Sequence, residues 1–253
     1  MTSGPARIVV DPDAGGRLAS LAIDGLEVLV ARDPDPMRWG SYPMVPFAGR
    51  VGRGRFRFDG REHRLPVNLE PHAIHGYGLT TPWAVVDERT LAYRLEPPWP
   101  FAGEVTQRFA LEPEWLRVVM TLTAHERQPV VLGWHPWFRR RLHKDGPSVE
   151  LDLAAASMYE LDVDALPTGR LVEPPPGPWD NCFTGFAASP VLRWGRELSL
   201  RLDSSADHWV VFDEPTDAVC VEPQTAAPDQ LENDDVVVEA GDHRTIELTI
   251  TWD

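Results

Sequence analysis

Hydrophobic and polar positions alternate with a period of two over most of the chain. The segment 244–252 places Ile246, Leu248, Ile250 and Trp252 on one face and polar residues on the other, as expected of a half-buried β-strand. Further segments with alternating or β-branched residues, which we expect to be strands, lie at 90–96, 105–111, 115–123, 149–154, 198–202, 208–212 and 217–222. Many short strands indicate an all-β fold, a large antiparallel β-sandwich.

Two Asp-Gly dipeptides predict tight hairpins. The stretch "RFRFDGREHRL" (55–65) turns at Asp59-Gly60, and "LAIDGLEVLV" (21–30) turns at Asp24-Gly25. Both dipeptides tolerate the positive φ angles that a two-residue hairpin turn requires. They therefore support antiparallel pairing between neighbouring segments.

Helical signals are weak by comparison. The 25 prolines are scattered along the chain, and no window of a dozen residues carries an apolar stripe with a period of 3.6. The one candidate for a short helix is "DQLEN", after Pro228. The proline-rich stretch 173–181 is predicted to be a stiff surface loop, because strand patterns of the same kind lie on both sides of it.

Length and composition limit the class of protein. A chain of 253 residues with 43% hydrophobic and 25% charged residues is long enough for one globular domain, which we expect to span 1–253. No run of about 18 apolar residues and no secretory pattern is present, so we expect no membrane partner and a cytoplasmic location.

Cys182 and Cys220 lack CxxC spacing, and both are expected to be free thiols. A net charge of −15 argues against nucleic acid as a partner.

Three stretches place an ionisable group beside a proline or a glycine. They are "HAIHGYG" (72–78), "GWHPWF" (133–138) and "VCVEPQT" (219–225). Proline keeps the preceding residue out of helical geometry, so His135 and Glu222 are expected at the ends of strands, where sites are built. Taken alone, His75 and His135 could equally be core histidines, and Glu222 a surface carboxylate.

Together these stretches resemble the aldose 1-epimerase, or mutarotase, family. The resemblance runs through most of the chain in the right order: "VPFAGRVGRGRFRFDGREHRL" is similar to the family's early arginine block, "IHGYG" to its His-Gly motif, "GWHPWF" to its second-histidine motif, "WDNCFTG" to its aspartate loop and "VEPQTAAPDQLEN" to its glutamate motif. The Glu-Pro-Gln-Thr and His-Pro-aromatic-Phe blocks are the specific ones. In one departure, Gly49 precedes Arg50 where the family usually has Asn.

The resemblance implies a galactose mutarotase-like supersandwich and an isomerase that interconverts the α and β anomers of a free aldose. Glu222 resembles the general base that takes the proton from the anomeric hydroxyl. His135 resembles the general acid that protonates the ring oxygen. Arg50, His75 and Asp180 resemble residues that hold the sugar hydroxyls or the ring oxygen. The partner implied is a small-molecule sugar, and the sequence leaves open whether the protein is a monomer or a homodimer.

This chemistry requires one base and one acid acting on different oxygens of one ring. Positioned proton transfer typically contributes about 10²- to 10⁴-fold per group. A glutamate and a histidine suit the reaction near neutral pH, because burial and neighbouring charges move their pKa values towards that range. No metal and no organic cofactor is required.

Several nearby aromatic and imidazole groups are harder to assign. Trp83, Trp134, Trp137 and Trp179 lie near the motifs, and any of them could stack on a sugar, although most tryptophans fill cores. His72, three residues before His75, is expected to face away from the site.

Three alternatives remain open. A hexose-6-phosphate 1-epimerase would need extra arginines for the phosphate, and "HGYGLTTPW" offers none. A non-catalytic carbohydrate-binding module on the same fold needs no matched acid–base pair. A metal enzyme would use His75, His135 and Glu222 as a two-His, one-carboxylate site, but such sites usually draw two ligands from a close HxH or HxD pair, and no such pair lies near these residues.

Overall fold

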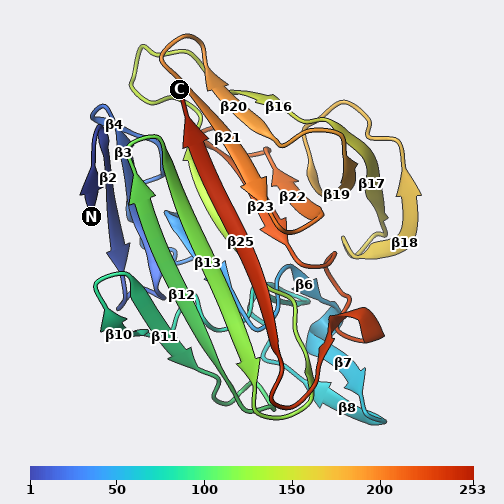
Figure 1. The fold of residues 1–253 in the computed structure, drawn as a ribbon. Helices are drawn as coiled ribbons and strands as arrows, with labels where there is room; N and C mark the ends of the chain where they lie inside the picture. The colour runs from blue at the N-terminus through green and yellow to red at the C-terminus, as the bar shows by residue number, and fades with distance from the viewer.

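Two large antiparallel sheets account for most of the chain, and the computed structural model describes all residues from 1 to 253. The larger sheet has eleven strands, in the order β1 (Thr2–Ser3), β2 (Ala6–Asp11), β3 (Arg17–Ile23), β5 (Ser41–Met44), β15 (Gly133–Arg139), β23 (Ala218–Gln224), β22 (His208–Phe212), β19 (Asp180–Phe186), β17 (Ala155–Leu161) and β18 (Pro167–Val172), with β4 (Leu26–Glu27) paired to β3. Figure 1 shows this sheet lying behind the second one. The all-β class predicted from the period of two is confirmed.

The second sheet has eight strands and runs across the front of Figure 1. Its order is β10 (Ala84–Asp87), β11 (Thr90–Arg94), β12 (Gly103–Glu112), β13 (Trp115–Ala124), β25 (His243–Trp252), β21 (Leu198–Ser204), β20 (Val191–Trp194) and β16 (Glu150–Asp152). Three two-stranded ribbons complete the fold: β6 (Arg50–Val51) with β9 (Ala73–Ile74), β7 (Arg55–Phe58) with β8 (Arg61–Arg64), and β14 (Gln128–Pro129) with β24 (Val237–Val238).

The core lies between the two sheets and joins residues from both of them. On β25, Ile246, Leu248, Ile250 and Trp252 are buried while the residues between them are partly exposed, which confirms the predicted face. Polar contacts also cross the interior, since the Trp134 indole on β15 donates to Gln107 Oε1 on β12 at 2.7 Å. The sandwich thus holds β15 rigidly from one side.

Both predicted hairpin turns are confirmed. Asp59 and Gly60 have φ angles of 48° and 74°, and Asp24 and Gly25 have φ angles of 49° and 81°. Two successive positive φ values are the signature of the turn type that matches the twist of antiparallel strands. The proline-rich stretch is a loop up to Trp179, as predicted, and both cysteines are free and buried.

Two expectations are wrong. The stretch "DQLEN" forms turns, and the only helical segments are the short 3₁₀ turns Gly52–Gly54 and Asp234–Val236. Asp229 has a φ of 61°, which no right-handed helix permits, and its carboxylate accepts the Gly52 amide at 2.8 Å. His135 and Glu222 also lie inside strands β15 and β23 rather than at their ends, because the prolines that follow them belong to the strands. The structure contains no helix with the length and hydrophobicity needed to span a bilayer.

Candidate active site

A row of side chains crosses the centre of the larger sheet on the face opposite the sandwich core. Tyr42 on β5 is paired with His135 on β15, and Glu222 on β23 is paired with Val210 on β22. The β15–β23 register, given by Gly133 opposite Gln224 and Trp137 opposite Cys220, puts His135 opposite Glu222. Because side chains alternate between the faces of a sheet, these residues come together on one surface. Segments nearly 90 residues apart in the sequence thus meet through strand pairing.

His135 and Glu222 are in direct contact. Nε2 of His135 lies 3.1 Å from Oε1 of Glu222, and their side chains are only 6% and 2% exposed. Gln224 Nε2 lies 3.4 Å from the other carboxylate oxygen. The pair, which the sequence proposed as acid and base, is therefore in close polar contact among the residues that line one cavity.

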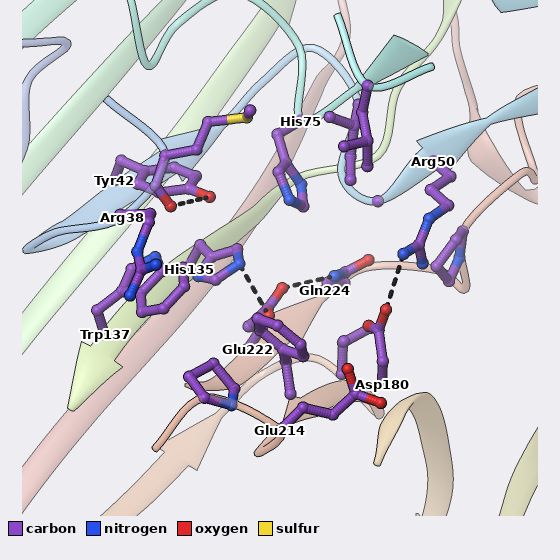
Figure 2. A pocket seen from close by; sticks show the side chains of 18 residues that line it. Arg38, Tyr42, Arg50, His75, His135, Trp137, Asp180, Glu214, Glu222 and Gln224 are labelled. Atoms are coloured by element: carbon purple, nitrogen blue, oxygen red, sulfur yellow. Dashed lines mark hydrogen bonds and ion pairs between the residues drawn. The ribbon is translucent and has the colours of Figure 1, made fainter. Parts of the chain in front are cut away.

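That cavity has a volume of about 400 Å³ and opens on the larger sheet. This volume falls in the usual range of small-molecule sites. All five residues singled out from the sequence line it: Arg50, His75, His135, Asp180 and Glu222. Figure 2 shows them converging on the same space from separate elements.

Arg50 and Asp180 form one wall of the cavity. Arg50 starts β6 and Asp180 starts β19, and Arg50 Nη2 donates to Asp180 Oδ2 at 2.7 Å (Figure 2). Gly49 before the arginine has a φ of 68°, and a Cβ there would lie 2.7 Å from atoms of Pro228. Glycine at this position permits both the left-handed backbone and the close approach to Pro228.

His75 stands above the pair, immediately after β9. Its φ of 63° is unusual for a residue with a side chain, and its amide donates to Gly49 O at 3.1 Å. The next residue must be glycine, since a Cβ on Gly76 would lie 2.2 Å from Val45 O. The His-Gly dipeptide therefore turns the chain sharply and directs the imidazole into the cavity.

Burial changes the protonation of these groups. It lowers the pKa of His135 to about 3 and raises the pKa of Glu222 well above its ordinary value, with the nearby Asp180 adding to the rise and Arg50 opposing it. Burial also lowers the pKa of His75. Two protons on the His135–Glu222 pair would bury a positive charge, and none would bury a negative one. The pair is therefore favoured with one proton and no net charge.

Several buried polar atoms of residues that line the cavity have no partner in the protein. They are Nδ1 of His75, Nδ1 of His135, Nε1 of Trp137 and Oε1 of Gln224. Buried polar groups are nearly always hydrogen-bonded, because an unpaired one loses its hydration without compensation. A cluster of unpaired donors and acceptors on one cavity is suited to a ligand rich in hydroxyl groups.

The structure adds residues that sequence reasoning missed. The imidazole of His135 stacks on the rings of Tyr42 and Trp137, with ring centroids 4.8 and 5.2 Å away. Further lining residues without a predicted role are Arg38, Phe212, Glu214 and Gln224. Gln224 could have been found, since it stands in the "VCVEPQT" stretch. Tyr42 carried no signal, because its segment shows no motif.

The four tryptophans near the motifs lie in different environments. Trp137 lines the cavity, whereas Trp134 and Trp83 are buried in the core and Trp179 lies in the proline-rich loop. His72 is outside the cavity as expected: Nδ1 accepts the Arg53 amide, and Nε2 lies 2.8 Å from Asp164 O.

The cavity does not assemble the two-His, one-carboxylate set weighed from the sequence. The possible ligand atoms that lie within 4.8 Å of one another belong to His135, Cys220 and Glu222. Burial raises the pKa of the Cys220 thiol well above its ordinary value, and a metal needs the thiolate. This donor set is therefore poorly suited to a cation.

Comparison with known proteins places these features in a family. A model of the family described as aldose 1-epimerase matches residues 5–251. The uncharacterized protein YphB of Escherichia coli (strain K12) is 28% identical over 245 residues, covering 83% of this chain and 82% of YphB. A galactose mutarotase-like protein from Clostridium acetobutylicum superposes with a TM-score of 0.86 at 14% identity, covering 100% of this chain and 94% of the other. A galactose 1-epimerase from Lactobacillus acidophilus NCFM superposes with a TM-score of 0.83 at 14% identity, covering 100% and 92%. The fold is the galactose mutarotase-like sandwich, as predicted.

Proposed function

The chain belongs to the aldose 1-epimerase family, a family of sugar epimerases, and from this premise we propose that it interconverts the α and β anomers of a free aldose. The protein would act as an isomerase, with one domain of aldose 1-epimerase type built on the core that the two sheets share. The observation that carries the proposal is the His135–Glu222 contact of 3.1 Å on a cavity that holds unpaired polar groups.

The reaction needs a proton acceptor at the anomeric hydroxyl O1 and a proton donor at the ring oxygen O5. Opening the ring breaks the C1–O5 bond as O1 loses a proton and O5 gains one. Rotation about C1–C2 and reclosure then give the other anomer. A pair that shares a single proton supplies one acceptor and one donor at the same time. No redox step and no electrophilic metal is needed.

We assign the base role to Glu222 and the acid role to His135, following the family. Burial favours Glu222 as the holder of the single proton in the empty cavity, so this assignment requires that the proton pass to His135 across the 3.1 Å contact when the sugar is bound. The register of β15 and β23 sets His135 opposite Glu222, which supports the proposal that the two groups act on the two oxygens bound to C1 of one pyranose. When the ring closes, the two groups exchange roles by microscopic reversibility. Stacking on Tyr42 and Trp137 limits the movement of the imidazole ring, which favours a fixed direction of proton transfer.

Arg50, His75 and Asp180 are proposed to hold the sugar. His75 has an unpaired Nδ1 on the cavity, and burial keeps its ring neutral, so it can donate to or accept from a hydroxyl. The Arg50–Asp180 pair is 19% and 31% exposed at its side chains and offers charge-assisted hydrogen bonds to further hydroxyl groups.

The proposal is tested by following anomer equilibration of freshly dissolved α-D-glucose, α-D-galactose and glucose-6-phosphate by polarimetry or NMR. We expect the wild type to accelerate at least one free sugar, and Glu222→Gln or His135→Asn to reduce that rate by roughly 10²-fold or more. Acceleration of the phosphorylated sugar alone would favour a hexose-6-phosphate 1-epimerase. Binding without acceleration across a broad panel of sugars would favour a carbohydrate-binding module.

A further inference from the structure

Glu214 is the one carboxylate on the cavity that has no partner in the protein. Asp180 is paired with Arg50, and Glu222 with His135. Glu214 lies in the loop between β22 and β23 and lines the cavity at its mouth. Figure 2 labels Glu214 among the side chains that line the cavity. A substrate entering the cavity therefore meets a negative charge that no neighbouring cation pairs with directly.

The cations around the mouth already have partners. Arg50 donates to Asp180 at 2.7 Å. Arg38 Nη2 lies 3.4 Å from Asp217 Oδ1, and its guanidinium lies over the Trp137 ring. Arg140 donates to the carbonyl oxygens of Asp213 and Pro215, on the backbone that carries Glu214. None of these three guanidinium groups is left without an acceptor.

The residues that line the cavity carry no excess of positive charge. Arg38 and Arg50 stand against the carboxyl groups of Asp180, Glu214 and Glu222. These five groups sum to one negative charge with Glu222 ionised and to zero when Glu222 holds a proton. The formal net charge of the whole chain is −15.

A phosphate-binding site needs the opposite arrangement. Phosphate and carboxylate groups are recognised by guanidinium groups whose N–H donors are free for paired, charge-assisted hydrogen bonds. An anionic group on a sugar in this cavity would meet the Glu214 carboxylate, and the two arginines that line the cavity, Arg38 and Arg50, already contact the carboxylates of Asp217 and Asp180. A cationic amino group would meet an unpaired carboxylate.

We propose that Glu214 sets the charge specificity of the cavity, selecting against aldoses with an anionic substituent and in favour of aldoses with a cationic amino group. The inference rests on the proposed function, because it names the substrate class of the same site. It also assigns a role to a residue that no sequence motif contains.

The expected size of the effect follows from Coulomb's law. At a separation of roughly 7 Å and an effective dielectric constant of about 40, one unit charge changes the relative rate by about sevenfold. The effect should fall towards unity at ~1 M salt, where the screening length is about 3 Å. A purely structural role of Glu214 would not produce this salt dependence.

The experiment compares three sugars that differ only at C6, in the gluco or galacto series. The substituents are a neutral hydroxyl, an anionic phosphate and a cationic amine. Anomer exchange is measured by NMR exchange spectroscopy for the wild type, for Glu214→Gln and for Glu88→Gln. Glu88 is an unpaired, exposed carboxylate in the β10–β11 turn of the other sheet, so its variant removes the same charge away from the cavity.

In Glu214→Gln we expect the phosphate-to-hydroxyl ratio of kcat/KM to rise by about sevenfold or more and the amine-to-hydroxyl ratio to fall by about sevenfold at low salt. Glu88→Gln should leave both ratios unchanged. Ratios that do not move, or that move in the same direction for both charged sugars, would overturn the inference.

The two proposals fail in different ways. Exchange of the neutral sugar with unshifted ratios overturns only the role of Glu214. Absence of exchange with every sugar overturns the proposed function. In that case the same ratios are read from dissociation constants measured by NMR titration, which test the charge selection without any turnover.

Discussion

The two faces of strand β15 are built from similar residues and serve different purposes. Trp134 and Phe138 point into the sandwich, where the Trp134 indole is hydrogen-bonded to Gln107 and Phe138 is fully buried. His135 and Trp137 point to the cavity, where His135 Nδ1 and Trp137 Nε1 have no partner. The named polar atoms are buried on both faces, but only those on the packed face have hydrogen-bond partners in the protein. The difference indicates that the packed face maintains the fold and the other face is completed by a ligand.

The largest change in stability should come from a substitution on the packed face of β15. Phe138→Ala leaves a cavity in the core, so we expect the free energy of unfolding to fall by about 3–5 kcal/mol. Urea denaturation measures the change. Val85→Ala on the exposed edge strand β10 is the control, because Val85 is 65% exposed and its loss should change stability by less than about 0.5 kcal/mol. A loss of less than about 1 kcal/mol for Phe138→Ala would show that the face is not tightly packed.

A matched pair of tryptophan substitutions compares the two faces directly. Trp134→Phe leaves Gln107 Oε1 buried without its donor, whereas Trp137→Phe removes an N–H that has no partner in the protein. We expect Trp134→Phe to lower the free energy of unfolding by about 1–2 kcal/mol more than Trp137→Phe does, as measured by thermal or chemical unfolding. Sugar affinity should weaken in Trp137→Phe only. Equal stability costs would contradict the distinction between satisfied and unsatisfied faces.

Burial of the acid–base pair predicts an unusual pH profile. An unperturbed glutamate–histidine pair, with pKa values of about 4.5 and 6.5, would be active between these two pH values. Its kcat/KM would fall by about tenfold between pH 6 and pH 7.5. Burial instead lowers the pKa of His135 to about 3 and raises the pKa of Glu222. It disfavours the doubly protonated pair at low pH and the proton-free pair at high pH, so the active range widens in both directions.

We therefore expect kcat/KM at pH 7.5, after subtraction of the uncatalysed rate, to stay within about twofold of its value at pH 6. An alkaline limb near pH 6.5 would mean that the imidazole is solvated and not buried. Glu222→Gln serves as the control, since its residual rate no longer depends on the pair.

The parts of the fold that could be read from the sequence have one face in solvent. Strand β25 and the hairpin β7–β8 alternate between buried and exposed residues, and that contrast is the periodic signal. Strands β5 and β15 are buried on both faces over nearly their whole length, so alternation disappears. They also contain Pro43 and Pro136, and a proline within a segment argues against a central strand.

The residues of the candidate site also divide into those that the sequence reveals and those that it does not. The resemblance supplied His135, Glu222, Arg50, His75 and Asp180, because each stands in a local motif. Tyr42 and Glu214 reach the cavity only through strand register and loop position, and neither leaves a trace in its neighbouring residues. The predicted helix after Pro228 failed because the Asp229 carboxylate binds a backbone amide in a segment far away in the sequence.

The most direct test of the central claim is a double-mutant cycle on the acid–base pair, read by NMR exchange of anomers. If His135 and Glu222 act as one unit on a bound aldose, His135→Asn and Glu222→Gln should each lower the exchange rate by roughly 10²-fold. The double variant should then also be lowered by only about 10²-fold in total. Losses that multiply to about 10⁴-fold, or single variants that equilibrate sugars as fast as the wild type, would contradict the account.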